Sequence, residues 1–243
     1  MANRPKKPTG TNGPFEVTVG ASAATVQWQT AQFPTGTEQI EAGIVGGFLK
    51  DADRQDLLPF SVTAAHQNPQ DDLDFTLETS SGRRYLELTE IAHFEKGEGF
   101  HSKVNGAYKP YDLASAIVAN FLKKSARYTA ITADAPILLL IYNTHWAFNL
   151  GDTALMLLQY FSQASRHCFE RIYYFRPLSE RLGTAYDVFP TPPEHWAGFD
   201  PEVCRDDVAY NLVPGAIEMR PEGGAIMSLT PRSTRTRAKN PRR

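Results

Sequence analysis

Polar and apolar residues alternate along two neighbouring stretches in the first half of the chain. Residues 74–78 and 84–90 each place polar side chains on one face and apolar side chains on the other. Residues 79–82 between them, Thr-Ser-Ser-Gly, are typical of a turn. The pattern predicts a β-hairpin whose register sets Asp74 directly opposite Glu87, with their Cβ atoms about 5 Å apart.

Two carboxylates at such a distance repel each other unless a proton or a cation lies between them. Mg²⁺ suits this arrangement, because it takes oxygen ligands and is commonly held by one or two carboxylates together with substrate phosphate. The alternative is that Asp74 and Glu87 are ordinary polar residues on the solvent face of an antiparallel hairpin. The sequence therefore predicts either a metal-binding pair or a solvated face.

Helical periodicity recurs in three longer stretches, and runs of strand length accompany them. The strand–helix–strand order after residue 136 predicts a parallel crossover, and the continuous apolar run in its first strand is typical of a strand buried on both faces. An alternating pattern near the N-terminus predicts a further short hairpin. The expected helices span residues 37–50, 111–128 and 152–165, and the expected strands span residues 15–19, 24–28, 59–63, 137–142 and 171–175.

The first helix carries an acidic residue on its apolar face. We expect Thr35 to cap this helix in a capping box with Glu38. Glu41 falls in line with the apolar positions, and a carboxylate on a packed face needs a partner. That partner is either a nearby basic residue or the site formed by Asp74 and Glu87.

Two adjacent lysines occupy different sides of the second helix. Lys123 falls opposite the apolar side and is expected in solvent. Lys124 falls at the margin of the apolar side, where a lysine can lay its stem along the core and project its amine over the sheet. The alternative is that Lys124 only contributes solubility.

Composition narrows the class of protein. The chain has 243 residues, of which 42% are hydrophobic, so it can bury a core, and it has no apolar run long enough to span a membrane. Cys168 and Cys204 lack the spacing of a redox pair and are expected to be reduced. A zinc site using His167 and Cys168 is the weaker alternative. These features predict a cytoplasmic protein.

Basic residues gather in two places, although the net charge is only −2. The loop over residues 93–110 mixes glycines, aromatic residues and lysines, which suits a phosphate backbone and stacked bases. The last 16 residues, 228–243, contain basic residues and no acid, which predicts contact with a polyanion. The alternatives are an ordinary surface loop and a solvated tail. The candidate nucleic-acid contacts are Lys96, Lys103, Lys109, Arg232, Arg235 and Arg237.

We therefore expect four segments. Residues 1–36 form an N-terminal extension, 37–180 the core, 181–227 an irregular proline-rich extension and 228–243 a basic tail.

The order of these elements resembles that of the PD-(D/E)xK nuclease superfamily. The matching residues are Pro69, Asp74-Phe75, Glu87-Leu88-Thr89-Glu90 and the strand at 138–142, and the likeness covers residues 37–180. The resemblance implies an α/β fold with a restriction-endonuclease-like core, in which helices flank a mixed central sheet, with N- and C-terminal extensions. It also implies a phosphodiesterase that cleaves nucleic acid, with DNA favoured over RNA as the substrate and with Mg²⁺ or Mn²⁺ as the cofactor.

By this resemblance, Asp74 and Glu87 of the present chain would bind the metal. Glu41 would act as a third carboxylate, directly or through water. The chain departs from the pattern at Thr89, where a lysine is usual. Lys124 would replace it from the following helix. Relatives often act as dimers or in complexes, so a homodimer or a partner protein is expected. One alternative is an inactive nuclease-fold protein that binds DNA or a protein. Another is a metal-free structural protein of phage or mobile-element origin.

Overall fold

A six-stranded mixed sheet forms the centre of the protein, in the strand order β3-β4-β5-β7-β8-β9. The computed structural model describes residues 15–19, 24–28, 33–34, 36–68, 73–91, 107–129, 134–144, 148–178, 182–210, 217–220 and 224–227. The strands of the sheet are β3 (Val62–Gln67), β4 (Phe75–Thr79), β5 (Gly82–Glu90), β7 (Ile137–Tyr142), β8 (Phe169–Pro177) and β9 (Gly183–Phe189).

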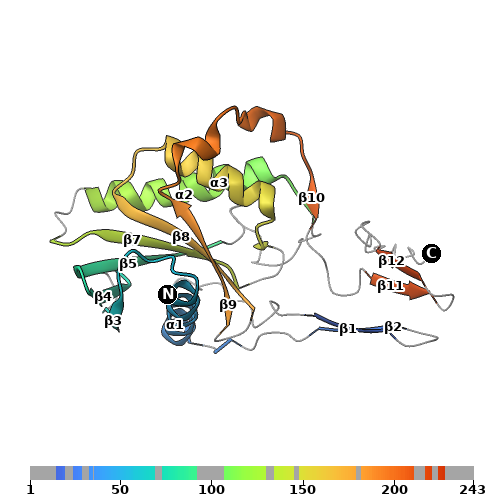
Figure 1. Ribbon diagram of the computed structural model, residues 1–243, viewed down its shortest axis with the longest axis horizontal. Helices are drawn as coiled ribbons and strands as arrows, with labels where there is room; N and C mark the ends of the chain where they lie inside the picture. The colour runs from blue at the N-terminus through green and yellow to red at the C-terminus, as the bar shows by residue number, and fades with distance from the viewer. Residues whose placement is uncertain are drawn as a thin grey trace, which may run out of the picture.

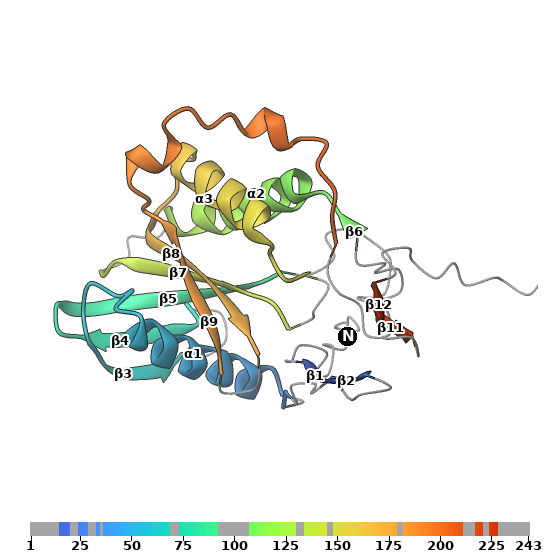
Figure 2. The same ribbon diagram turned by 45° about the vertical axis from the view of Figure 1, so that its right-hand side comes forward.

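Helices cover both faces of this sheet. Helix α1 (Thr37–Arg54) lies on one face, and helices α2 (Pro110–Thr129) and α3 (Asp152–Ala164) lie together on the other (Figure 1). Figure 2 shows the sheet running between these two layers. The expectation of an α/β protein with a mixed sheet flanked by helices is confirmed.

The predicted hairpin register is confirmed. Phe75 pairs with Leu86, and Thr79 pairs with Gly82 across a two-residue turn. Gly82 has a φ of +103°, which a residue without a Cβ adopts at low cost. The polar face of the hairpin is not exposed to solvent along its whole length, however. Strand β5 also pairs in parallel with β7, which sets Glu87 beside Leu139 in the middle of the sheet.

Alternation along β4 and β5 decides which side chains enter which core. The apolar positions, such as Leu77 and Leu86, pack with Phe48 of α1 in one cluster. The other face carries a second cluster, in which Phe121 of α2 packs with Leu139 of β7. Every position of β7 is buried, as its continuous apolar run predicts for a strand between two helical layers.

The three predicted helices are confirmed, and the strands β7 and β8 are parallel as expected. The predicted cap of α1 is wrong. The first helical hydrogen bond runs from the amide of Ile40 to the carbonyl of Gly36, so Gly36 is the N-cap, and no side chain caps it. Because Gly36 occupies the N-cap position, the expected N-cap at Thr35 is not the one observed.

Two predictions on strands are wrong. The strand expected over residues 59–63 begins only at Val62. The segment expected to be irregular after residue 180 contains β9, which pairs antiparallel with β8 as an edge strand of the central sheet. Helix α1 holds this edge, because the amide of Ala185 donates to Asp51 Oδ2 at 2.8 Å and Gln55 donates to the carbonyl of Ala185 at 3.2 Å. Two of the prolines that favoured an irregular segment, Pro193 and Pro201, follow this strand and open the short 3-10 helices η2 (Pro193–Trp196) and η3 (Pro201–Cys204).

Three small sheets complete the described part. The expected N-terminal hairpin is confirmed as β1 (Phe15–Val19) and β2 (Ala24–Trp28). The other two were not expected: β6 (Ala107–Tyr108) pairs with β10 (Ala209–Tyr210), and β11 (Ile217–Arg220) pairs with β12 (Gly224–Met227).

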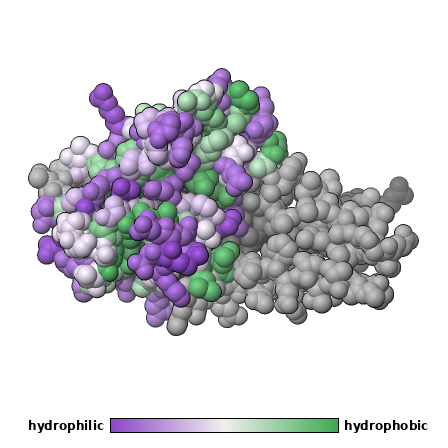
Figure 3. Space-filling model, viewed as in Figure 1, coloured by the Kyte–Doolittle hydropathy of each residue, from purple (hydrophilic) through white to green (hydrophobic). Residues whose placement is uncertain are grey.

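Hydrophilic and hydrophobic side chains are interspersed over the described surface seen in Figure 3. No helix among the described residues is long and apolar enough to cross a bilayer. The predictions on residues 1–14 and 228–243, and on Lys96 and Lys103, fall outside the described residues.

Candidate functional site

Asp74 and Glu87 lie side by side where β4 begins. Asp74 immediately precedes the first residue of β4, and its Oδ2 accepts a hydrogen bond from the backbone amide of Leu88 at 2.6 Å. Glu87 is 2% exposed and lies on the face of β5 that α2 covers. The hairpin register and this hydrogen bond together fix the Asp74 carboxylate next to that of Glu87.

The ammonium of Lys124 contacts the same site from helix α2, which covers this face of the sheet. Its Nζ lies 2.5 Å from Glu87 Oε1 and 2.5 Å from the carbonyl oxygen of Leu88. The preceding residue, Lys123, is exposed. The amphipathic pattern of α2 thus places one of two adjacent lysines on the buried carboxylate and the other in solvent.

Arg127 and Tyr128 also belong to this site, although neither was predicted from the sequence. Arg127 Nη2 lies 3.9 Å from Glu87 Oε1. Its guanidinium carbon lies 4.6 Å from the centre of the Tyr128 ring, and it donates a hydrogen bond to the Tyr128 hydroxyl. These residues follow Lys124 by three and four positions, so all three share one side of the helix. That spacing was the available sequence signal.

Burial and the neighbouring charges shift the pKa of Asp74. Burial and, after it, the charge of Glu87 raise the pKa of Asp74 from 3.8 to about 6. The hydrogen bond from Leu88 and the charge of Lys124 oppose this rise. Asp74 is therefore largely ionised at neutral pH and becomes protonated in mildly acidic solution.

Glu41 lies close enough to this site for its charge to act on Asp74. It is half-buried on α1, and Gln67 donates to its Oε2 at 3.4 Å. Its charge contributes to the raised pKa of Asp74. Burial raises the pKa of Tyr142, and the charges of Glu90, Glu41 and Asp74 raise it further. Within the described ranges no three acidic, histidine or cysteine side chains gather closely enough to hold a metal ion.

The acidic pair itself has the chemistry of a divalent-metal site. Glu87 Oε2 is buried and has no hydrogen-bond partner among the described residues. An ionised oxygen buried in this way is costly unless a positive charge compensates it. Carboxylate oxygens are also the ligands that Mg²⁺ prefers. The donor types of Asp74 and Glu87 therefore suit a hard divalent ion, although Lys124 already supplies one positive charge to Glu87.

The remaining predicted residues lie elsewhere or lack the expected chemistry. Thr89 is 4% exposed, and its hydroxyl has no hydrogen-bond partner in the described part of the chain. Lys109 forms an ion pair with Asp206 at 3.2 Å. It lies just before α2 and is separated from Lys124 by roughly 22 Å of helix. Cys168 and Cys204 are free, and no cluster of metal-ligating side chains in the described ranges supports the zinc alternative.

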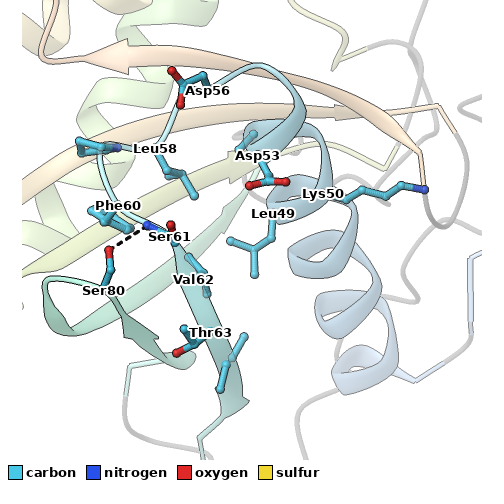
Figure 4. Close-up of a pocket in the computed structure, with 14 residues that line it drawn as sticks. Leu49, Lys50, Asp53, Asp56, Leu58, Phe60, Ser61, Val62, Thr63 and Ser80 are labelled. Carbon is cyan, nitrogen blue, oxygen red and sulfur yellow. Dashed lines mark hydrogen bonds between the residues drawn. The ribbon is translucent and has the colours of Figure 1, made fainter.

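A separate cavity of about 800 Å³ lies between α1 and the edge strand β3. Leu49, Lys50 and Asp53 of α1 lie on one side of it, and Phe60 and Val62 lie on the other (Figure 4). None of the residues around Glu87 lines it. The acidic site is therefore not part of this hollow.

No protein-family model matches the sequence, and no curated protein matches it significantly. Among solved structures, the chain is similar to that of Pyrococcus furiosus SfsA in complex with Ca²⁺, at 11% sequence identity and a TM-score of 0.30. The match covers 71% of this chain and 74% of that one.

Proposed function

We propose that this protein is a divalent-metal-dependent phosphodiesterase that acts on nucleic acid, with DNA as the favoured substrate. The observation that carries the proposal is the meeting of three charged groups from separate elements: Asp74 before β4, Glu87 in β5 and Lys124 in α2. Two carboxylates beside one amine form a set that can hold a cation and also face a phosphate.

Each residue has a distinct role in this proposal. Asp74, oriented by the Leu88 amide, and Glu87, fixed in the sheet, would hold Mg²⁺ or Mn²⁺. When bound, the ion would lower the pKa of a water molecule and stabilise negative charge on a phosphate. Lys124 would leave Glu87 and donate to a phosphate oxygen. Glu41 would raise the negative potential at Asp74 from the opposite face of the sheet.

The substrate class rests on the resemblance to the nuclease superfamily and on the basic residues of the chain. Arg232, Arg235 and Arg237 would contact the phosphate backbone at a distance from the acidic site, and Lys96, Lys103 and Lys109 would add further contacts. A homodimer or a partner protein would complete the assembly on DNA.

A second candidate is a nuclease-fold protein that binds DNA or a protein without cleaving it. The observation that favours it is the way Lys124 already neutralises Glu87. With the amine on both Glu87 Oε1 and the Leu88 carbonyl, the site is compensated without any metal. Thr89 also offers no replacement cation.

A nuclease assay on plasmid, single-stranded DNA and RNA, with Mn²⁺ and with Mg²⁺, tests the proposal. We expect cleavage by the wild type and none by Asp74→Asn or Glu87→Gln. The matched control is Glu78→Gln, because Glu78 lies on the same hairpin but pairs with Arg83 near the surface. Full activity in either site variant contradicts the assignment. Calorimetric metal binding without cleavage of any substrate favours the second candidate.

A further inference from the structure

An exposed arginine is held beside the buried carboxylate of Glu87. The side chain of Arg127 is 63% exposed, whereas that of Glu87 is 3% exposed, and their charged groups are 3.9 Å apart. An exposed arginine usually moves freely in solvent. Arg127 is instead fixed by Tyr128, which is 5% exposed and provides both a ring surface and a hydroxyl acceptor.

Lys124 and Arg127, the two cations of α2 at this site, differ in how many hydrogen-bond donors remain free. The amine of Lys124 is 2.5 Å from each of two oxygens, so the protein itself satisfies it. A guanidinium has five N–H donors in a fixed fork. The described contacts of Arg127 are with Tyr128 and, at longer range, Glu87. Most of its fork therefore faces solvent at the rim of the acidic site.

The charge balance defines what would bind there. The carboxylates of Asp74 and Glu87 are matched by the cations of Lys124 and Arg127, so the four groups sum to about zero when both acids are ionised. A divalent ion held by the acids would make the sum positive by about two charges, or by about one when the nearby carboxylate of Glu41 is counted. An anion would restore the balance, and a planar guanidinium suits phosphate oxygens because it can donate two parallel hydrogen bonds.

We propose that Arg127 binds a phosphate group of the substrate at the rim of the Asp74/Glu87 site, and that the ligand class is a nucleic-acid phosphodiester. This inference rests on the proposed function and adds the residue that holds the phosphate. Tyr128 is the positioning residue, because its ring and hydroxyl fix the guanidinium. Lys124 contacts Glu87 and the Leu88 carbonyl in the metal-free protein. Its proposed contact with a phosphate oxygen would form only after metal binding, so Arg127 would be a separate phosphate contact.

The competing explanation is that Arg127 only compensates the charge of Glu87. In that case its removal would lower the thermal stability and would leave phosphate binding unchanged. If Arg127 holds a phosphate, its removal weakens binding of nucleic acid and leaves metal affinity and melting temperature close to those of the wild type.

Fluorescence anisotropy separates these outcomes without relying on turnover. The probes are fluorescein-labelled single-stranded and duplex DNA with phosphorothioate linkages, titrated with the full-length protein in Ca²⁺. We expect Arg127→Gln to weaken binding about tenfold or more, because the variant cannot form the charge-assisted hydrogen bonds to phosphate. The slope of the logarithm of the binding constant against the logarithm of salt concentration should decrease by about the contribution of one phosphate contact. Arg127→Lys should bind with intermediate affinity, since it keeps the charge without the fork.

The matched control is Arg83→Gln. Arg83 is also an exposed arginine, at 53%, but it lies at the turn end of β5, where it pairs with Glu78. Wild-type binding by Arg127→Gln, or an equal loss in both variants, overturns the inference.

Cleavage assays on the same proteins keep the two proposals apart. If the wild type binds DNA but cleaves no substrate, and Arg127→Gln binds DNA more weakly, the proposed activity fails and the phosphate site stands. If the wild type cleaves and Arg127→Gln binds normally, the activity stands and the phosphate site fails.

Discussion

The Nζ of Lys124 in α2 lies 2.5 Å from Oε1 of Glu87 in β5, although the two residues are 37 positions apart in the chain. This ion pair places a positive charge over the strand face on which Thr89 supplies none. The same ammonium also contacts the carbonyl oxygen of Leu88. A cation is therefore already present at the oxygens that a divalent ion would approach.

The first prediction follows from this competition. We expect Lys124→Met to bind Mn²⁺ more tightly than the wild type, because the variant lacks the ammonium that neutralises Glu87. Without metal it should be less stable, by on the order of 2 kcal/mol, since a buried carboxylate loses its partner. Added metal should then raise its melting temperature more than that of the wild type. Cleavage should be lost.

Lys123→Met is the control for that experiment, because Lys123 is exposed on the same helix. It should bind metal, melt and cleave as the wild type does. Equal behaviour of the two variants would show that Lys124 has no special relation to the metal.

The second prediction concerns pH. The pKa of Asp74 is about 6 in the folded protein against an ordinary value of 3.8, so the folded state binds its proton more tightly than the unfolded state. The resulting stabilisation is complete below about pH 4 and is lost as the pH rises through 6. In EDTA, the wild type should therefore lose stability relative to Asp74→Asn between these values. At pH 8 the variant should be the more stable protein.

Thermal unfolding of both proteins from pH 4 to pH 8 measures this difference. Asp187 also has a pKa raised to about 6 by burial, but it is present in both proteins, so its contribution cancels. A difference in stability that does not change with pH would contradict the raised pKa of Asp74.

The third prediction concerns the buried hydroxyl of Thr89. Leaving a buried hydroxyl without a partner costs about 1–3 kcal/mol. Thr89→Val keeps the shape and removes that group, so we expect it to raise the free energy of unfolding by about 1 kcal/mol. Thr76→Val is the contrast, because the Thr76 hydroxyl donates to Asn68 at 2.9 Å, and its loss should destabilise the protein. Equal losses of stability in the two variants, measured by urea unfolding, would show that Thr89 has a partner after all.

The fourth prediction concerns the basic residues 228–243. Deleting them should weaken DNA binding and flatten its salt dependence, because each contact with a phosphate of duplex DNA contributes a slope of about 0.9. The melting temperature should not change. Binding titrations over a range of KCl concentrations measure the slope, and an unaltered slope would mean that these residues do not touch DNA.

Local residue patterns were sufficient to predict the features that depend on neighbouring residues. Alternation with a period of two, closed by a short turn, was sufficient to oppose Asp74 and Glu87, because the pleat and the turn fix the register. The helical period of α2 was sufficient to separate Lys124 from Lys123. The continuous apolar run at 137–142 was sufficient to predict a strand buried on both faces.

The surroundings of those local elements depend on how the helices and strands pack together. Periodicity shows that a helix has an apolar side, but packing decides which strand that side covers. Helix α2 covers β5, so Glu87 is buried beneath Lys124 and Arg127 instead of facing solvent. In the same way, β9 follows no strong local pattern and becomes a strand because β8 and Asp51 of α1 satisfy its backbone. Contacts between segments far apart in the chain depend on how whole faces fit together, and the local pattern of residues does not encode that fit.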